Sequence, residues 1–393
     1  MARLYVFAPL GEAHRLAGRI DWNEGVGEYT YAPSWLADAA SYSLDPRNLP
    51  LSTGAFITTL NEGVHGVLAD AGPDAWGRKL LELHRGRVPE TPLELLRVAN
   101  GAGTGGLLFS QHRDGPDPTR ALATMSSLPE LEDAARQISD GNVVSPVDVE
   151  LIFASGSPLG GARPKANVLH EGVQWIAKFS RSDDVVDVPR VEWACLATAR
   201  AAGVEVPDHA LVAVNGRSVL LVKRFDRPVG RGVHYLSLHA LLSMDRLTRA
   251  DVTAPTGVCT YGGLAAMCRQ IGVADAGSSL FRRMIVNLAI GNTDDHLRNH
   301  GLLCLDGQWR MTPAFDLTAT GGELQAIGVG TEGRAATLDN ALSDLSRFDL
   351  GKQDAQAIQA EVRDAMEGMR ERLIEAELPA GQLSLVLARM RRV

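Results

Sequence analysis

The sequence predicts an α+β fold of two or three domains, and three observations support this prediction. The chain has 393 residues, whereas a typical domain has about 100–200. Between residues 166 and 223, short β-rich segments are joined by turn dipeptides. From about residue 235 the apolar residues follow a helical period instead. We therefore expect a strand-rich region followed by a mainly helical one.

The composition is that of a globular protein, with 45% hydrophobic and 22% charged residues. A net charge of −8 makes the chain a poor candidate for binding nucleic acid alone, because such binding needs a basic surface. The four cysteines form no C-x-x-C pair, so neither a zinc ribbon nor a redox dithiol is expected. Four thiols in a chain of this length do not indicate a secreted disulfide scaffold. The sequence has neither the apolar core of a signal peptide nor an apolar run of 18 residues, so we expect a soluble cytoplasmic protein.

Residues 1–110 are expected to form an N-terminal unit. Strands are predicted near residues 3–8 and 17–21, and an amphipathic helix over 74–84. The glycine-rich segment 101–106 lacks the Lys-Ser/Thr of a phosphate-binding loop, so we interpret it as a flexible turn. Residues 111–150 are predicted to be a linker, with a connecting helix over 128–138.

Residues 151–234 are expected to form a second unit, which contains two hairpins. The first joins 166–170 to 173–179, and the second joins 211–214 to 218–223 through Asn215-Gly216. A helix between them begins at Pro189 and ends at Gly203. In residues 235–393 we expect a helix through 280–289, a hairpin over 301–311 and an unbroken helical stripe over 358–373.

The segment 291–299 carries the most informative motif. Asp294 and Asn299 are five positions apart, as are the aspartate and asparagine of the protein-kinase catalytic loop. Phosphoryl transfer needs a carboxylate that accepts the proton of a hydroxyl and a neutral oxygen ligand for Mg²⁺. Asp316 follows the next predicted hairpin, where kinases place a second metal ligand, although the order Phe-Asp-Leu replaces D-F-G. Alone, each motif is also compatible with a polar loop or a turn.

Upstream, Lys178 lies inside an apolar strand and Glu192 on the following helix, the arrangement of the phosphate-orienting ion pair of kinases. An edge-strand lysine and a solvated glutamate are the alternative. The segment 155–165 places Gly160, Gly161 and two basic residues directly before this strand. Glycines there allow backbone N–H groups to approach phosphate oxygens. A transition-metal site at His296 and His300 is disfavoured, because the surrounding residues indicate a loop.

Together these motifs resemble the HipA family of bacterial serine/threonine kinases, the toxins of HipA–HipB toxin–antitoxin pairs. The matching stretches are 159–166, 176–179, 222–227, 291–299 and 313–316, with 67–78 similar to the N-terminal segment of that family. The resemblance implies a bilobal protein-kinase-like fold with an N-terminal α/β subdomain and an all-helical C-terminal lobe. Residues 151–234 would be its nucleotide-binding lobe.

The resemblance also implies the role of each site residue. Asp294 would be the catalytic base, and Asn299 and Asp316 would hold Mg²⁺. The ATP site would consist of Gly160, Gly161, Ala162, Arg163, Lys165, Lys178, Glu192, Lys223, Phe225 and His296. Among these, Lys178 would contact the ATP phosphates, and Lys223 and Phe225 would offer backbone groups to the adenine.

Regulation and partners are also implied by the resemblance. Family members phosphorylate proteins such as glutamyl-tRNA synthetase, are restrained by a DNA-binding HipB antitoxin and autophosphorylate a serine in the glycine-rich loop. Here Pro158 stands where that serine is expected, which leaves Ser157 as the best candidate and Ser155 as the second. Two alternatives remain at this point: a small-molecule kinase on a related fold, and a non-catalytic scaffold that binds the antitoxin.

Overall fold

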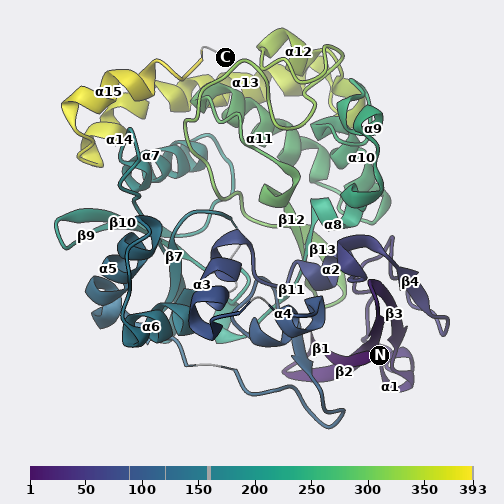
Figure 1. Ribbon diagram of the computed structural model, residues 1–393. Helices are drawn as coiled ribbons and strands as arrows, with labels where there is room; N and C mark the ends of the chain where they lie inside the picture. The colour runs from purple at the N-terminus through teal and green to yellow at the C-terminus, as the bar shows by residue number, and fades with distance from the viewer. Residues whose placement is uncertain (88, 120, 157–160, 392–393) are drawn as a thin grey trace.

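The computed structural model describes residues 1–87, 89–119, 121–156 and 161–391, and it contains three sheets (Figure 1). The first is five-stranded in the order β4-β3-β2-β1-β5, and the second is five-stranded in the order β6-β7-β8-β10-β9. The third has the order β11-β12-β13. Helices and strands mix in one α+β fold, as the sequence predicts.

The first sheet belongs to the N-terminal unit. Its strands are β1 (Ala2–Leu10), β2 (Ala13–Asn23), β3 (Val26–Tyr31), β4 (Phe56–Thr58) and β5 (Leu108–Ser110), all antiparallel. The helices are α1 (Pro33–Leu36), α2 (Gly66–Ala69), α3 (Ala75–Arg85) and α4 (Pro92–Val98). Both predicted strands and the predicted helix are present. Both strands are longer than predicted, and in β2 the added residues include His14, Arg15 and Asn23, polar residues that still pair with neighbouring strands.

The second sheet belongs to the nucleotide-binding lobe predicted for residues 151–234. Its strands are β6 (Ala123–Thr124), β7 (Lys165–His170), β8 (Val173–Phe179), β9 (His209–Val214) and β10 (Arg217–Lys223). The helices are α5 (Leu128–Ser139), α6 (Pro146–Gly156) and α7 (Val188–Ala201). Both hairpins turn where predicted, with positive φ at Glu171-Gly172 and at Asn215-Gly216. This geometry matches the twist of the flanking strands.

Helix α3 packs against the second sheet although the sequence places it in the N-terminal unit. Trp76, Leu80 and Leu81 are buried in one cluster with Val168 of β7 and Phe179 of β8. Figure 1 shows α3 lying near β7. The N-terminal unit therefore shares a core with the lobe that follows it.

The C-terminal lobe is mostly helical, with the third sheet as its strand component. The strands are β11 (His234–Ser237), β12 (Gly301–Leu305) and β13 (Gln308–Met311), and the last two form the predicted hairpin. The helices are α8 (Leu238–Leu242), α9 (Arg249–Thr253), α10 (Tyr261–Gln270), α11 (Ala276–Ile290), α12 (Leu338–Leu342), α13 (Lys352–Glu367), α14 (Met369–Glu375) and α15 (Ala380–Leu387).

The apolar stripe over 358–373 belongs to two helices, so the prediction of an unbroken helix is wrong. Gly368 ends α13 and precedes α14, and glycine is a poor helix former. Short 3₁₀ turns also occur: η1 (Leu60–Glu62), η2 (Met125–Ser127), η3 (Pro228–Gly230), η4 (Met244–Arg246), η5 (Leu297–Asn299) and η6 (Leu345–Phe348).

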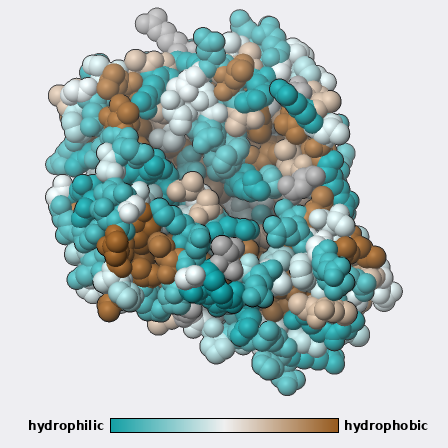
Figure 2. All heavy atoms as spheres, viewed as in Figure 1, coloured by the Kyte–Doolittle hydropathy of each residue, from teal (hydrophilic) through white to brown (hydrophobic). Residues whose placement is uncertain are grey.

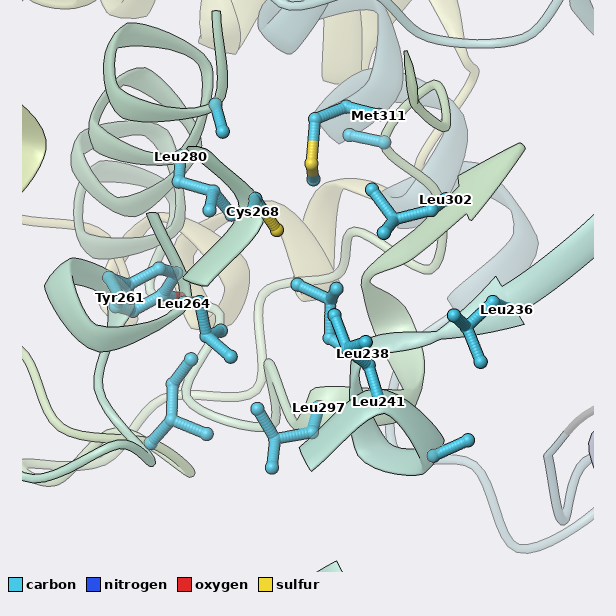
Figure 3. Close-up of a cluster of buried hydrophobic side chains, with 14 of the residues drawn as sticks. Leu236, Leu238, Leu241, Tyr261, Leu264, Cys268, Leu280, Leu297, Leu302 and Met311 are labelled. Atoms are coloured by element: carbon cyan, nitrogen blue, oxygen red, sulfur yellow. The ribbon is translucent and has the colours of Figure 1, made fainter. Parts of the chain in front are cut away.

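Buried apolar side chains anchor the loop after α11. Figure 3 shows Leu297 of η5 in a cluster with Leu238 and Leu241 of α8 and Leu264 of α10. Leu297 is 4% exposed and lies between Asp294 and Asn299 in the chain. The predicted catalytic loop is thus fixed by a core residue in its middle.

The four cysteines are buried and free.

The face of the molecule seen in Figure 1 is mostly polar. Figure 2 shows that hydrophilic residues cover most of the face seen in Figure 1, with apolar residues in separate groups. Among the described residues, no helix is both long and apolar enough to cross a membrane.

Candidate active site

A cavity of about 680 Å³ lies where the three parts of the chain meet. The N-terminal unit contributes Asp70, Asp74 and Arg78 to its lining, and the second lobe contributes Lys165, Lys178 and Glu192. The C-terminal lobe contributes His296, Asn299 and Asp316. This size is within the range of about 300–1,000 Å³ that is typical of ligand pockets.

Lys178 forms ion pairs with two carboxylates at the wall of this cavity. Its Nζ lies 2.5 Å from Glu192 Oε1 and 2.7 Å from Asp316 Oδ1. The ion pair between Lys178 and Glu192 that the sequence predicts is therefore present, and it extends to a third residue. Burial disfavours the charged form of Lys178, but Asp316 and Glu192 outweigh burial and raise its pKa. Lys178 is consequently a fixed cation at neutral pH.

Asp316 has an unusual backbone for a residue with a side chain, because its φ is +60°. Non-glycine residues rarely adopt this left-handed conformation, and such residues are common at functional sites. Its side chain is 48% exposed. The Lys178 ammonium lowers the pKa of Asp316 to about 2, against the opposing effect of burial. The carboxylate is thus ionised and open to the cavity.

The loop between α11 and β12 presents the other predicted residues. Asn299 Nδ2 donates to the backbone oxygen of Asp294 at 3.3 Å and ties the two ends of the motif together. Asn299 lines the cavity, and the hydrogen bond to Asp294 uses its Nδ2 and not its Oδ1. Asp294 is exposed, as a residue that meets an acceptor must be, although it is not among the cavity-lining residues. His296 is exposed and lines the cavity.

Asp295 points the opposite way, into the protein. It is 2% exposed and accepts hydrogen bonds from the hydroxyl of Tyr261 and from Asn287 Nδ2 at 2.6 Å. His300 Nε2 also lies 2.9 Å from its Oδ2. These contacts join α10, α11 and the start of β12. Asp295 therefore braces the loop, and of the two neighbouring aspartates only Asp294 is exposed.

The glycine-rich segment is only partly at the cavity. Gly161, Ala162 and Lys165 line it. Arg163 does not; its guanidinium forms an ion pair with Asp184, so the prediction that Arg163 belongs to the ATP site is not supported by this structure. Gly160, Ser157 and Pro158 lie outside the described residues.

Ser155, the second candidate for autophosphorylation, is described and is fully buried in α6. Its Oγ accepts a hydrogen bond from the backbone N–H of Ala123 at 3.3 Å. A buried hydroxyl in a helix is inaccessible to a phosphate donor, so Ser155 is a poor candidate.

The end of β10 and the segment after it border the cavity. Lys223 and Phe225 line it, and the rings of Phe225 and Phe315 lie 5.4 Å apart. The backbone N–H of Lys223 already donates to Asp208 O at 2.8 Å, so it is not available to an adenine. The N–H of Lys223 is therefore engaged within the protein, and the contact of Lys223 with adenine stays a prediction.

Sequence reasoning missed an important link beside this segment. Arg224 is 3% exposed, and its guanidinium donates to the backbone oxygens of Ala102 and Gly103 at 3.0 and 2.6 Å. Asp226 accepts from the N–H of Gly105 at 2.8 Å. The turn predicted for residues 101–106 is present, but these contacts hold it against the second lobe, so it is not the flexible turn that was expected. The charged residues of the segment 222–227, three of which are buried, were the only sequence feature that could have indicated this contact.

The donor atoms at the cavity suit Mg²⁺. Asp316 supplies an ionised carboxylate and Asn299 a side-chain carbonyl, and hard oxygen ligands are those that Mg²⁺ prefers. Among the described residues, no group of three or more His, Cys, Asp or Glu side chains could hold a metal ion by itself. A site with two protein oxygens fits a Mg²⁺ ion that is also held by substrate phosphates.

Comparison with known families assigns both halves of the chain. Residues 12–110 match the HipA N-terminal domain, and residues 157–373, more than half of the chain, match the HipA-like C-terminal domain. The chain belongs to the HipA family. The resemblance inferred from the motifs is thereby confirmed.

One solved structure shows the same fold as this HipA family member. A chain of the Shewanella oneidensis MR-1 toxin–antitoxin complex of HipA, HipB and operator DNA matches 98% of this chain and 96% of its own length. The TM-score is 0.69 at 16% sequence identity. A Helicobacter pylori proinflammatory kinase, CtkA, matches 58% of this chain at 12% identity with a TM-score of 0.37, too low to bear on the fold.

Among curated proteins, this HipA family member is similar to "Putative kinase Y4dM" of Sinorhizobium fredii (strain NBRC 101917 / NGR234). The two are 28% identical over 165 residues, which are 38% of each chain. The match thus spans well under half of that relative's length.

Proposed function

We propose that this protein is an ATP- and Mg²⁺-dependent serine/threonine protein kinase of the HipA toxin type, which phosphorylates a cellular protein and so arrests growth. One observation carries this proposal. Lys178 is joined to both Glu192 and Asp316 at the wall of a cavity that Asn299 also lines. Kinases use such a lysine–glutamate pair and such metal-binding residues to hold nucleotide phosphates.

Each residue has a role in the proposed reaction. Asn299 and Asp316 hold Mg²⁺, which neutralises charge on the phosphates. Lys178 and Lys165 contact those phosphates, with Gly161 and Ala162 beside them. Phe225 and the carbonyl of Lys223 border the base, and His296 lies at the mouth of the cavity.

Asp294 is the proposed catalytic base. Its carboxylate accepts the proton of a serine or threonine hydroxyl while that oxygen bonds to the γ-phosphorus and ADP leaves. The exposed position of Asp294 supports this role, because the acceptor must approach from solvent.

The proposed partners follow from the family and the structural match. A HipB-like helix-turn-helix antitoxin would restrain the kinase, and operator DNA would be bound mainly through that antitoxin. The Shewanella structure, which contains HipA, HipB and operator DNA, supports this arrangement. For the substrate, glutamyl-tRNA synthetase and other translation factors are the first proteins to test. Ser157 remains the proposed site of autophosphorylation.

The decisive experiment is incubation with γ-labelled ATP and Mg²⁺, alone and with a cell lysate. We expect label on one or a few proteins, no label after chelation with EDTA, and none with Asp294→Asn. Label on small molecules alone would contradict a protein substrate. No label with any acceptor, from a protein shown to be folded, would contradict the kinase proposal.

A further inference from the structure

Asp74 lies in the N-terminal unit, yet the structure places it against Lys165, the first residue of β7 in the second lobe. It caps α3, with Oδ1 accepting from the backbone N–H of Gly77 at 2.8 Å. Its other oxygen, Oδ2, lies 3.6 Å from Lys165 Nζ. Both side chains are largely buried, with 15% of Asp74 and 6% of Lys165 exposed. The contact is a pairing of charges at a distance longer than a hydrogen bond.

The same turn of α3 also holds the backbone of Lys165. Trp76 is 3% exposed and packs in the core of the second lobe. Its Nε1 donates to the backbone oxygen of Lys165 at 3.0 Å. Asp74 and Trp76 therefore contact Lys165 at its ammonium and at its main chain, two residues apart on one element.

The position of Lys165 explains why it needs such a partner. It is directly opposite Lys178 in the antiparallel pairing of β7 and β8, so both side chains lie on one face of the sheet. Like charges in this position repel. Glu192 and Asp316 compensate Lys178, and Asp74 supplies a carboxylate to Lys165.

The Lys165 ammonium also lies at the glycine-rich loop. A Cβ added to Gly161 would come within 2.6 Å of Lys165 Nζ, so any side chain there would displace the ammonium. Asp74, Gly161 and Lys165 all line the cavity. The Lys165 ammonium thus lies between the Asp74 carboxylate of the N-terminal unit and Gly161 of the glycine-rich segment.

The geometry points to Asp74 as a positioning residue for nucleotide binding: through it, the N-terminal unit holds the Lys165 ammonium where the ATP phosphates bind. The inference rests on the proposed function, because it assumes that the cavity takes ATP. A cation held in place before the nucleotide arrives loses less conformational freedom on binding than a mobile one, which favours affinity.

The test is a double-mutant cycle in the full-length protein. Asp74→Asn removes the charge but keeps an equally good helix cap. We expect this variant to bind Mg²⁺-ATP about tenfold more weakly by calorimetry, a typical coupling between linked sites, with adenosine affinity unchanged. In a Lys165→Met background, Asp74→Asn should cause no further loss. Glu82→Gln, which removes a charge from an exposed position of the same helix, is the matched control and should bind like wild type.

Three results would overturn the inference alone: unchanged or tighter Mg²⁺-ATP binding by Asp74→Asn, an undiminished loss in the Lys165→Met background, or an equal loss for adenosine. The last would show a general disturbance of the cavity. A folded wild-type protein that binds neither Mg²⁺-ATP nor adenosine would instead refute the proposed function, and the inference with it.

Discussion

Lys178 Nζ lies 2.7 Å from Asp316 Oδ1, although the two residues are 138 positions apart in the chain. The contact lies at the wall of the cavity and joins the second lobe to the segment that follows the C-terminal hairpin. A change at either residue therefore acts on both walls of the proposed nucleotide site.

Loss of the Asp316 carboxylate should weaken Mg²⁺-dependent nucleotide binding. Asp316→Asn keeps a residue that tolerates the left-handed backbone but removes the charged metal ligand. We expect Mg²⁺-ATP affinity to fall at least about tenfold, or 1.4 kcal/mol, in calorimetry. Asp306→Asn is the matched control, because Asp306 is also exposed with a φ of +50° but sits in the turn of the β12–β13 hairpin. Equal affinities of Asp316→Asn and wild type would remove Asp316 from the metal site.

Removing Lys178 should destabilise the protein through Glu192. Lys178→Met leaves a carboxylate of 6% exposure beside an apolar group, and breaking a buried ion pair costs about 3–5 kcal/mol. Lys178 is 19% exposed, so the lower end is expected. Lys178→Met/Glu192→Gln should recover most of the stability in urea unfolding but none of the phosphate transfer. Recovery of both would show that the pair has only a structural role.

His234 should make the junction between the N-terminal unit and the C-terminal lobe sensitive to acid. It is fully buried, and its Nε2 lies 2.7 Å from Leu44 O. Burial lowers the pKa of His234 to about 4, from an ordinary value of 6.5. The unfolded chain therefore takes up this proton first as the pH falls. The contribution of neutral His234 to the free energy of unfolding is complete above pH 6.5. It is lost as the pH falls from 6.5 to 4, by up to about 3 kcal/mol.

His234→Gln should accordingly flatten the dependence of unfolding free energy on pH in that interval. The difference from wild type isolates this residue from the other histidines. His112→Gln, at an exposed position, should leave the curve unchanged. A His234→Gln curve parallel to that of wild type would contradict this assignment.

Autophosphorylation should occur at Ser157. A phosphoryl group in a loop that cradles phosphates would repel the nucleotide and favour release of the loop. Mass spectrometry after incubation with Mg²⁺-ATP should find phosphate on Ser157, and Ser157→Ala should remove it. Phosphate only at sites distant from residues 155–165 would refute this mode of control.

Local patterns predicted the hairpins and the pair of Lys178 and Glu192, because the residues that define them are close in sequence. Turn dipeptides such as Asn215-Gly216 determine their own backbone. Contacts between distant segments were not predictable in this way. The spacing of apolar residues in α3 does not show that Asp74 meets Lys165. The sequence around Arg224 does not show that Arg224 holds residues 101–106. Both contacts depend on how the units pack. The break at Gly368 was missed because the apolar spacing continues across it.

Asp294, and not its neighbour Asp295, should be the catalytic base. Asp294 is exposed and tied through its carbonyl to Asn299, whereas Asp295 is buried among Tyr261, Asn287 and His300. Loss of a positioned general base costs about 10²–10⁴ in rate. Asp294→Asn should therefore bind Mg²⁺-ATP almost normally, transfer almost no phosphate and be harmless when overexpressed.

Asp295→Asn should behave differently, because its effect passes through the loop. An amide cannot accept all three hydrogen bonds, so we expect a loss of about 1–3 kcal/mol in unfolding free energy. Phosphate transfer by the folded fraction should fall less than in Asp294→Asn. Single-turnover transfer, normalised to folded protein, separates the two variants. Near-wild-type transfer by Asp294→Asn would mean that the catalytic loop is wrongly assigned, since no other exposed carboxylate has the five-residue offset to Asn299.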